Sequence, residues 1–471
     1  MGVTNLGDNL INNAQGLGDF IPINSTIKQG SIEFFLFDVN LTTGVGEFYE
    51  LLVFVTGNIC RQPPGLTEDD PSLLVYYSFN YSMINDLSVA KRSEFNYGYV
   101  EMLADLPYTS AQNTLTLYLA VQAPENTNSS ATWKYELGAS QNGLVFQWDE
   151  RDWSCLVDAD DKSALIVTGN LTGIVDSNKP DESLFSVYLF PESIQEELRL
   201  LNRSRCAVLS SDALQIPNAF TSSYTNRTGM LQEQFFVDGL NDSTTYVAYV
   251  ISNFATNSTG GALYKPFAFE TMSQGSCELI YDLDFCLQVA YSVASNSTLN
   301  ATGTKQLYDI YAQNLYTNFS KALQQVACNT TSTSVFSPVR TCEDCAESYK
   351  NWLCSIAIPR CTTVNHTEYM LREAGTGRNS FIKDTVVPET DYYEILPCLS
   401  MCYSMVRDCP AVFGFGCPSG NSTIALSYGW DSSDDYPTCN SVGKLTSMAQ
   451  GHMSVNWVSM IVMFAVLGLV L

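Results

Sequence analysis

The chain has 471 residues, of which 45% are hydrophobic, and its 49 Asp and Glu against 23 Lys and Arg give a net charge of −26 at pH 7. This length leaves room for two to four domains, and the apolar content excludes a disordered protein. A surface this acidic repels phosphate groups, which argues against nucleic acids and anionic lipid surfaces as partners.

Two features indicate the secretory pathway. The fifteen cysteines are expected to form disulfides in an oxidising compartment. Because their number is odd, at least one thiol is free, bonded to another chain, or paired with a cysteine outside this sequence. The second feature is the density of Asn-x-Ser/Thr sequons, which are acceptor sites for N-linked glycans. The sequons are Asn24, Asn40, Asn80, Asn128, Asn170, Asn202, Asn226, Asn241, Asn257, Asn296, Asn300, Asn318, Asn329, Asn365 and Asn421.

Residues 1–25 are predicted to be a flexible lead-in, and residues 26–150 the first of two antiparallel β-sandwich-like domains. The lead-in has neither the basic nor the apolar region of a signal peptide, so we expect the N-terminus to be incomplete. Short β-branched and aromatic runs separated by Gly, Pro, Asn and Asp are typical of sandwich strands. We expect strands at 32–39, 51–55, 73–77, 115–121 and 133–137.

Residues 151–275 repeat this pattern and are predicted to form the second sandwich-like domain. The expected strands lie at 164–168, 184–190, 234–237, 245–250 and 268–271. A helix is expected at 192–201.

Residues 276–440 are predicted to form a disulfide-rich, mainly helical domain. Helical periodicity replaces alternation at 305–326. The apolar stripe of this helix is expected to contain Leu307, Ile310, Tyr311, Leu315 and Leu323. The disulfide candidates are the twelve cysteines of this region: Cys277, Cys286, Cys328, Cys342, Cys345, Cys354, Cys361, Cys398, Cys402, Cys409, Cys417 and Cys439.

Two stretches of this region, 341–361 and 397–418, hold eight cysteines and predict two short helices joined by disulfides. In the second stretch one helix face carries Cys398, Cys402, Met405 and Cys409, and Pro410 ends the helix. In the first stretch Cys342 and Cys345 share a face with Tyr349, Trp352 and Leu353.

The C-terminal end predicts a membrane attachment. The apolar segment 457–471 follows a polar spacer at 441–456. This arrangement resembles the signal for a glycosylphosphatidylinositol (GPI) anchor, with Asn440 as the candidate attachment site. A short membrane-spanning tail is the alternative, although about 22 Å of helix is short for a bilayer.

No residue pattern indicates catalysis or a cofactor. The two histidines, His366 and His452, lie in a sequon loop and in the spacer, where neither is placed as a catalytic base. Paired cysteines at 342 and 345 favour structural disulfides over a redox dithiol or a zinc site, since ten other cysteines flank them and no βαβ pattern does. The acidic clusters at 158–161 and 431–435 lack the spacing of a calcium-binding loop, which favours solvated loops.

The two cysteine-rich stretches resemble frizzled-type cysteine-rich domains. The resemblance is carried by Trp352, Cys354, Pro359, Arg360 and Cys361, then by Pro397-Cys398, Cys402, Cys409, Phe413, Phe415 and Cys417-Pro418. With the sequon-rich β region before them, the chain is similar to the mating-induced-death family, a fungal stretch-activated calcium-channel regulatory component.

This resemblance implies a non-enzymatic auxiliary subunit at the extracellular face of the plasma membrane, with passage through the endoplasmic reticulum. Its partner would be the large four-repeat pore subunit of a calcium channel, and the frizzled-like domain would dock on it to support stretch- or stress-activated influx. Aromatic and arginine side chains dominate interface energetics. The docking candidates are therefore Tyr349, Trp352, Pro359, Arg360, Phe413 and Phe415.

Two alternatives remain at this point. One is a secreted or cell-wall-associated glycoprotein that binds glycans or another ligand and has no channel partner. The other is a binder of lipid or lipid-modified ligands, which a continuous apolar groove in the cysteine-rich domain would favour.

Overall fold

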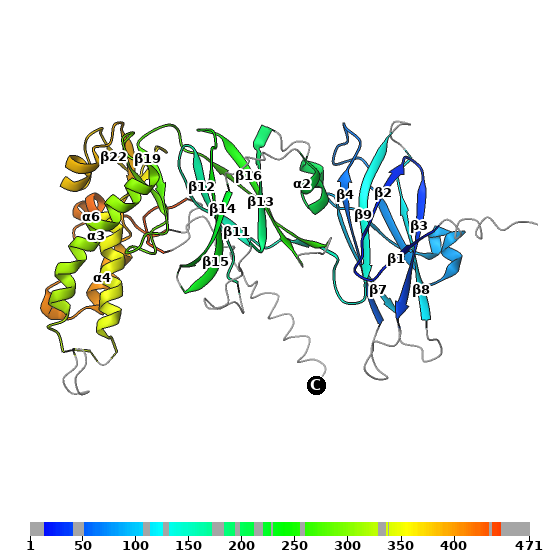
Figure 1. Cartoon of the computed structure of the whole chain (residues 1–471), viewed down its shortest axis with the longest axis horizontal. Helices are drawn as coiled ribbons and strands as arrows, with labels where there is room; N and C mark the ends of the chain where they lie inside the picture. Colours follow the sequence, from blue (N-terminus) through cyan, green and yellow to red (C-terminus); the bar gives the residue numbers. More distant parts are fainter. Residues whose placement is uncertain are drawn as a thin grey trace, which may run out of the picture. The chain divides into compact units, whose positions relative to one another are not determined.

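The computed structural model describes residues 14–40, 51–106, 114–125, 131–171, 183–193, 198–211, 220–227, 229–254, 260–327, 336–337, 339–432 and 436–443 (Figure 1). It is mostly β-sheet, with five sheets, a few helices and several disulfides. Two compact units share the chain. Unit 1 contains Met1–Arg151, Leu184–Gln215 and Tyr246–Ala268, and unit 2 contains Asp152–Ser183, Ile216–Thr245 and Phe269–Leu471.

Unit 1 contains three sheets, with strand orders β1-β3-β8-β5-β6, β2-β9-β4-β7 and β10-β17-β16-β13. Their strands are β1 (Gln15–Leu17), β2 (Ile23–Lys28), β3 (Ile32–Asn40), β4 (Leu51–Arg61), β5 (Leu74–Ser78), β6 (Lys91–Glu94), β7 (Tyr99–Leu106), β8 (Thr114–Gln122), β9 (Thr132–Ser140), β10 (Phe146–Asp149), β13 (Phe185–Pro191), β16 (Thr245–Asn253) and β17 (Gly261–Tyr264). Short helical elements are η1 (Tyr81–Ile84), η2 (Leu87–Val89), η5 (Arg199–Leu201) and α2 (Arg205–Ser210), and β18 (Phe267–Glu270) follows β17 along the chain.

The core of unit 1 joins the inner faces of its first two sheets and extends to the third sheet and α2. Alternation along β3 buries Phe35, Phe37 and Val39, each at most 2% exposed, because successive strand residues point to opposite faces. These side chains share one hydrophobic cluster with Val55 of β4 and Trp133 of β9. Contact between the inner faces of two sheets is the packing of a β-sandwich.

Every strand predicted between residues 26 and 275 is confirmed. One prediction for unit 1 was wrong. The lead-in 1–25 contains β1 and the start of β2 in its described part, and Leu17 reaches the core. Of the helix expected at 192–201, the described residues 192–193 and 199–201 (η5) form 3-10 turns, and residues 194–197 lie outside the described ranges. The helix α2 begins later, after the N-cap Ser204.

Unit 2 contains two sheets, with strand orders β11-β12-β15-β14 and β19-β20-β21-β23-β22. Their strands are β11 (Ser154–Ala159), β12 (Ser163–Thr168), β14 (Phe220–Arg227), β15 (Met230–Asp238), β19 (Cys277–Ile280), β20 (Tyr291–Ala294), β21 (Arg360–Thr362), β22 (Met370–Arg372) and β23 (Tyr392–Ile395). Its helical elements are α3 (Ala301–Leu323), α4 (Cys342–Ala357), η6 (Ile382–Val386), α5 (Leu399–Asp408), η7 (Ala411–Phe413) and α6 (Asn421–Ser427).

The region predicted as mainly helical, 276–440, is a mixture of helices and a five-stranded sheet. The strands β19 to β23 are three or four residues long, so none shows enough alternation to be recognised as a strand. In Figure 1 the helices α3 and α4 run side by side along this region.

The helix predicted at 305–326 is confirmed as α3, and its predicted apolar stripe is confirmed in part. Leu323 is buried, and Leu307 and Tyr311 pack against the core. Ile310 and Leu315 are instead 56% and 39% exposed. Tyr308 is buried instead, where its hydroxyl donates to a backbone carbonyl of β20 at 2.7 Å. Asp309 is buried because its carboxylate accepts two backbone N–H groups of segment 285–286, each at 2.8 Å. The packed face of α3 therefore combines apolar residues with polar groups that have backbone partners.

Within the described ranges, no helix combines the length and the apolar character needed to cross a bilayer. The predicted apolar tail at 457–471, most of the spacer at 441–456 and residues 1–13 of the lead-in lie outside those ranges.

Candidate functional site

The candidate site is built on α4, the helix of the first cysteine-rich stretch. Thr341 is its N-cap and forms a capping box with Asp344: the Asp344 N–H donates to the Thr341 hydroxyl at 3.1 Å, and the Thr341 N–H donates to the Asp344 carboxylate at 2.7 Å. The hydrogen bonds that the Thr341 N–H and hydroxyl donate to the Asp344 carboxylate lower the pKa of Asp344. Cys345 and Leu353 lie on the buried face, as predicted.

The helix α5 packs against α4 through the predicted stripe. Cys398, Cys402, Met405 and Cys409 are all at most 7% exposed, and α5 ends immediately before Cys409 and Pro410. The bond between Cys345 and Cys409 ties the two helices together. The prediction of two short helices joined by disulfide is therefore confirmed.

The predicted disulfide cysteines pair with one another. The bridges join Cys277 to Cys361, Cys286 to Cys354, Cys345 to Cys409, Cys398 to Cys439 and Cys402 to Cys417. Cys342 is also disulfide-bonded, and Cys328 lies outside the described residues. Since Cys345 pairs with Cys409 and not with Cys342, these two cysteines form no redox dithiol.

Four docking candidates lie together in one aromatic cluster with Phe319 of α3. The Tyr349 ring stacks on Phe319 at 3.6 Å between centroids, and the Phe415 ring stacks on Tyr349 at 5.6 Å. Phe413 lies 5.4 Å from Phe415, and Trp352 lies 5.4 Å from Tyr349. All four candidates are half-buried. We call Tyr349, Trp352, Phe413 and Phe415 the aromatic cluster.

The surroundings of the aromatic cluster fix its shape and leave apolar surface in water. The Trp352 indole N–H donates to the Tyr428 hydroxyl at 3.0 Å. Val412, next to Phe413 in η7, is 83% exposed, and Trp430 is 61% exposed. Asp408 ends α5 and is held by Ser348 at 2.6 Å and Arg340 at 3.0 Å.

The other two docking candidates are buried and lie outside this cluster, so their assignment to the docking surface was wrong. Pro359 is buried before β21. Arg360 is 7% exposed, and its guanidinium pairs with the Asp158 carboxylate at 3.2 Å. In a chain this acidic, an arginine suggests a role at the surface. Arg360 instead balances the charge of the buried Asp158 carboxylate.

The acidic cluster at 158–161 is largely structural. Asp158 accepts the Ser292 N–H at 2.8 Å in addition to its bonds with Arg360. Asp160 is fully buried, and its carboxylate accepts backbone N–H groups of Ser163 and Leu279 at 2.6 and 2.9 Å. Of the cluster at 431–435, residues 433–435 lie outside the described residues.

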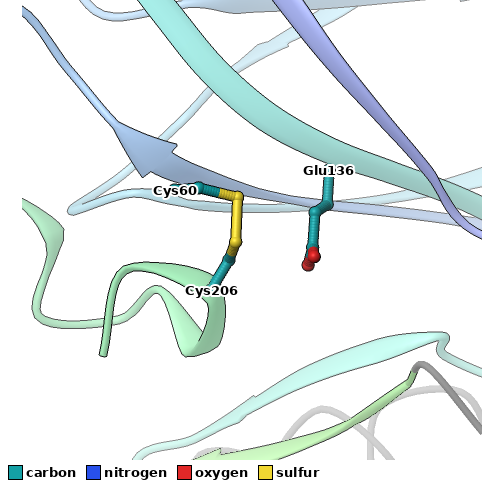
Figure 2. A group of neighbouring side chains, drawn as sticks. All are labelled: Cys60, Glu136 and Cys206. Carbon is teal, nitrogen blue, oxygen red and sulfur yellow. A yellow bond between two sulfur atoms is a disulfide. The ribbon is translucent and has the colours of Figure 1, made fainter. Parts of the chain in front are cut away.

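Unit 1 contains a disulfide that the sequence reasoning missed. Cys60 of β4 bonds to Cys206 of α2, 146 residues later. Figure 2 shows the Glu136 carboxylate beside this bond, and ligand atoms of the three residues lie within 4.8 Å of one another. Two thiolates and a carboxylate would suit zinc, but sulfurs joined to each other are not available as thiolate ligands. Burial raises the pKa of Glu136, an effect that the positive charge of Arg205 opposes.

The parity of the cysteines could have indicated this bond. Twelve lie in the cysteine-rich region, which leaves Cys60, Cys155 and Cys206. Cys155 is a buried thiol of β11 that forms no disulfide, which accounts for the odd number.

The profile of the family described as "Stretch-activated Ca2+-permeable channel component" matches residues 52–445. The chain belongs to this family. It is 37% identical to the "Stretch-activated cation channel MID1" of Saccharomyces cerevisiae, over 94% of this chain and 89% of that protein. It is 34% identical to "Stretch-activated cation channel yam8" of Schizosaccharomyces pombe, over 69% and 67% of the two chains.

A third relative of this channel component, the "Stretch-activated cation channel MID1" of Cryptococcus neoformans var. grubii, is 30% identical over 37% of this chain and 33% of its own length. Among solved structures, the glycoside hydrolase domain of Endo-D from Streptococcus pneumoniae R6 aligns with 53% of this chain and 32% of that chain. Its TM-score of 0.19 and 9% identity are too low to indicate a shared fold.

The sequons of the channel component lie on its surface wherever the structure describes them. Asn202 and Asn296 are half-buried, and the others are exposed: Asn24, Asn40, Asn80, Asn170, Asn226, Asn241, Asn300, Asn318, Asn365 and Asn421. Asn128, Asn257 and Asn329 lie outside the described residues. The Asn296 amide donates to the Val386 carbonyl, so its nitrogen is already engaged.

Asn440, the candidate site for a lipid anchor, is unsuited to that role. Its side chain is 1% exposed. Its backbone donates to Leu396 at 2.7 Å and accepts from Cys398 at 3.0 Å, next to the bridge between Cys398 and Cys439. Cleavage and modification need an accessible peptide bond, so this assignment was wrong. Small residues indicate lipid-attachment sites in a sequence, but they do not reveal whether the attachment residue is buried in the fold.

Proposed function

We propose that this channel component is an extracellular auxiliary subunit of a plasma-membrane calcium channel. In this proposal it docks on the large four-repeat pore subunit and supports stretch- or stress-activated calcium influx. The aromatic cluster carries the proposal, because half-buried aromatic side chains beside exposed apolar ones are typical of protein-binding surfaces. Val412, which is next to Phe413 and 83% exposed, is the accessible apolar residue on which we test the proposal.

An extracellular position is supported by the covalent chemistry of the chain. Disulfides persist in oxidising compartments, and bridges occur in both units. The exposed sequons leave room for N-linked glycans on both units, which we propose are added in the secretory pathway. Membrane attachment through the C-terminal tail, by a GPI anchor or a short membrane segment, belongs to the same proposal, with a lipid attached at a residue other than Asn440.

We also propose that the protein has no catalytic activity, and that the region 276–440 is related to frizzled-type domains. The carboxylates of Asp158 and Asp160 are engaged by the fold, which supports a structural role for them. The disulfide that joins the helices α4 and α5 supports the proposed relation of region 276–440 to frizzled-type domains. An experimental structure of the region with a different order of bridges would contradict this second proposal.

The test of docking is affinity purification of the detergent-solubilised protein from its native membrane. The variant Val412→Asp places a charge on the surface without disturbing the core, because Val412 is largely exposed. We expect the amount of co-purified pore subunit to fall at least tenfold, since a central interface residue contributes about 2 kcal/mol or more.

A matched control is Leu103→Asp, at an apolar residue of unit 1 that is 47% exposed. This variant should retain the pore subunit at the wild-type level. Equal recovery by both variants would contradict docking through the aromatic cluster, and absence of any pore protein from the wild-type sample would contradict the auxiliary-subunit proposal.

A further inference from the structure

Unit 1 contains a cavity of about 460 Å³ that has no role in the proposed docking. The loop before β5 forms one wall through Thr67, Glu68 and Asp70, and the hairpin after β6 forms another through Asn96 and Tyr97. The buried residue Trp133 contributes to the lining. This volume accommodates a small ligand.

The charge of the cavity excludes anionic ligands. Its lining contains the carboxylates of Glu68, Asp70 and Glu94 and no Lys, Arg or His, although Glu68 also forms an ion pair at 3.4 Å with Arg199, which is not a lining residue. Like charges at this density repel phosphate, sulfate and carboxylate groups. The lining therefore selects a neutral or a cationic ligand.

The carboxylates of the cavity are held in place by hydrogen bonds that leave acceptor capacity. Asp70 accepts the N–H and the hydroxyl of Thr67 at 2.7 and 2.8 Å through one oxygen, Oδ2. Glu94 accepts the Ser72 N–H at 2.9 Å through Oε1. An ionised carboxylate has about four lone-pair positions, so each group can accept further hydrogen bonds from a ligand.

A cation site made of three carboxylates does not fit the geometry. In the described part of the chain, the group of three carboxylate, thiol or imidazole ligands within 4.8 Å of one another is Cys60, Glu136 and Cys206, none of which lines the cavity. The lining also contains the side-chain amides of Gln62 and Asn96 and the hydroxyls of Thr67 and Ser72. It therefore offers hydrogen-bond donors as well as acceptors.

An aromatic ring completes the cavity at a turn whose backbone is strained. Tyr97 has φ of 49° and Gly98 φ of 83°, in a two-residue turn between Asn96 and Tyr99. Such turns favour Asn or Gly at the first position, and a bulky residue there is uncommon. Arg203 fixes this turn, because its N–H donates to the Tyr97 carbonyl at 3.0 Å and its guanidinium lies 5.3 Å from the ring centroid.

We propose that this cavity binds a neutral oligosaccharide. Sugar hydroxyl groups would donate to Glu68, Asp70 and Glu94. The amides of Gln62 and Asn96 would donate to sugar oxygens, and the Tyr97 ring would cover an apolar sugar face. Aromatic rings beside paired donors and acceptors match the alternating C–H and O–H surface of a pyranose. The inference is independent of calcium-channel function, so failure of either leaves the other testable.

Two sources could supply an oligosaccharide of this chemistry: a cell-wall polysaccharide, or a glycan on a neighbouring glycoprotein. Titration calorimetry of the full-length glycoprotein would use a β-1,3-linked glucose oligosaccharide for the first and an α-linked mannose oligosaccharide for the second. Saturable binding of either probe supports the proposal and identifies the source. Absence of binding to both probes would overturn it, as would preferential binding of a lysine-rich peptide.

The decisive variant is Tyr97→Asn, which removes the ring but places a residue that favours positive φ at the turn. We expect at least a tenfold loss of affinity with a melting temperature no lower than that of the wild type. The matched control is Tyr81→Asn, at an exposed tyrosine of unit 1 outside the cavity, which should leave affinity unchanged. Unchanged affinity in Tyr97→Asn, or equal losses in both variants, would overturn the proposal.

Discussion

The two units of the chain are stabilised in different ways. In unit 1 one large hydrophobic cluster extends through the sheets and α2, with two small clusters around Met83 and around Phe146, and one disulfide is described, between Cys60 and Cys206. In unit 2 the described apolar residues fall into separate smaller clusters, around Tyr308, around Cys402 and around Leu165, and the bridges are concentrated there. Small cores bury too little surface to be stable alone, so the bridges compensate for a divided core.

The largest expected effect comes from the buried ion pair of unit 2. In Arg360→Met the Asp158 carboxylate loses its charged partner while staying buried, which should destabilise unit 2 by about 3–5 kcal/mol. The measurement is chemical denaturation monitored by fluorescence. The double variant with Asp158→Asn should recover part of the loss. A single variant as stable as the wild type would show that unit 2 does not depend on this contact.

The second effect concerns the bridge between α4 and α5. Replacing Cys345 and Cys409 by Ser together should cost about 2–5 kcal/mol, because the unfolded chain regains the freedom that the bridge removes. Limited proteolysis should then cleave 276–440 first. Replacing Cys60 and Cys206 in the same way is the control, and we expect unit 1 to stay folded on its continuous core. Equal unfolding of both units would contradict the contrast drawn between them.

The third effect depends on pH. Arg407, with Ser348 and Arg340, lowers the pKa of Asp408 below its unfolded value of about 3.9. The carboxylate therefore contributes stability above that value, and the contribution is lost as the pH falls through the folded pKa. Asp408→Asn should cost about 1–3 kcal/mol at neutral pH and little in acid. A loss that is independent of pH would mean that packing, and not charge, accounts for the effect.

The smallest effect is expected in unit 1, at Glu136. Its folded pKa is raised by burial, so the charged form opposes folding, and stability falls as the pH rises through that folded value. Glu136→Gln should raise the melting temperature slightly at neutral pH and flatten its dependence on pH, as measured by calorimetry. A lower melting temperature would mean that attraction to Arg205 outweighs desolvation.

The sequence predicted those elements whose pattern is local. Alternation identified β3 and β8, and the spacing of Cys398, Cys402 and Cys409 identified the buried face of α5. The strands β19 to β23 are too short to carry a pattern, and the lead-in strand β1 forms only by pairing with β3. Strand and disulfide partners that are distant in sequence could not be predicted from these local patterns.

The residues of the candidate site also fall into those that a local pattern predicted and those that it did not. The aromatic cluster was anticipated because Tyr349 and Trp352 share one helix face and Phe413 and Phe415 lie close in sequence. Arg360 and Asn440 were misassigned because burial depends on contacts with Asp158 and Leu396, which no local pattern reveals. The bond between Cys60 and Cys206 was missed for the same reason.

The most direct test of a calcium-channel role is complementation in Saccharomyces cerevisiae cells that lack their own stretch-activated cation channel MID1. Calcium influx is measured after membrane stretch, in cells expressing the wild type, Val412→Asp or Leu103→Asp at equal surface levels. We predict that the wild type and Leu103→Asp restore influx and that Val412→Asp does not. Full influx with Val412→Asp would contradict action through the aromatic cluster, and no influx with the wild type would contradict the channel role itself.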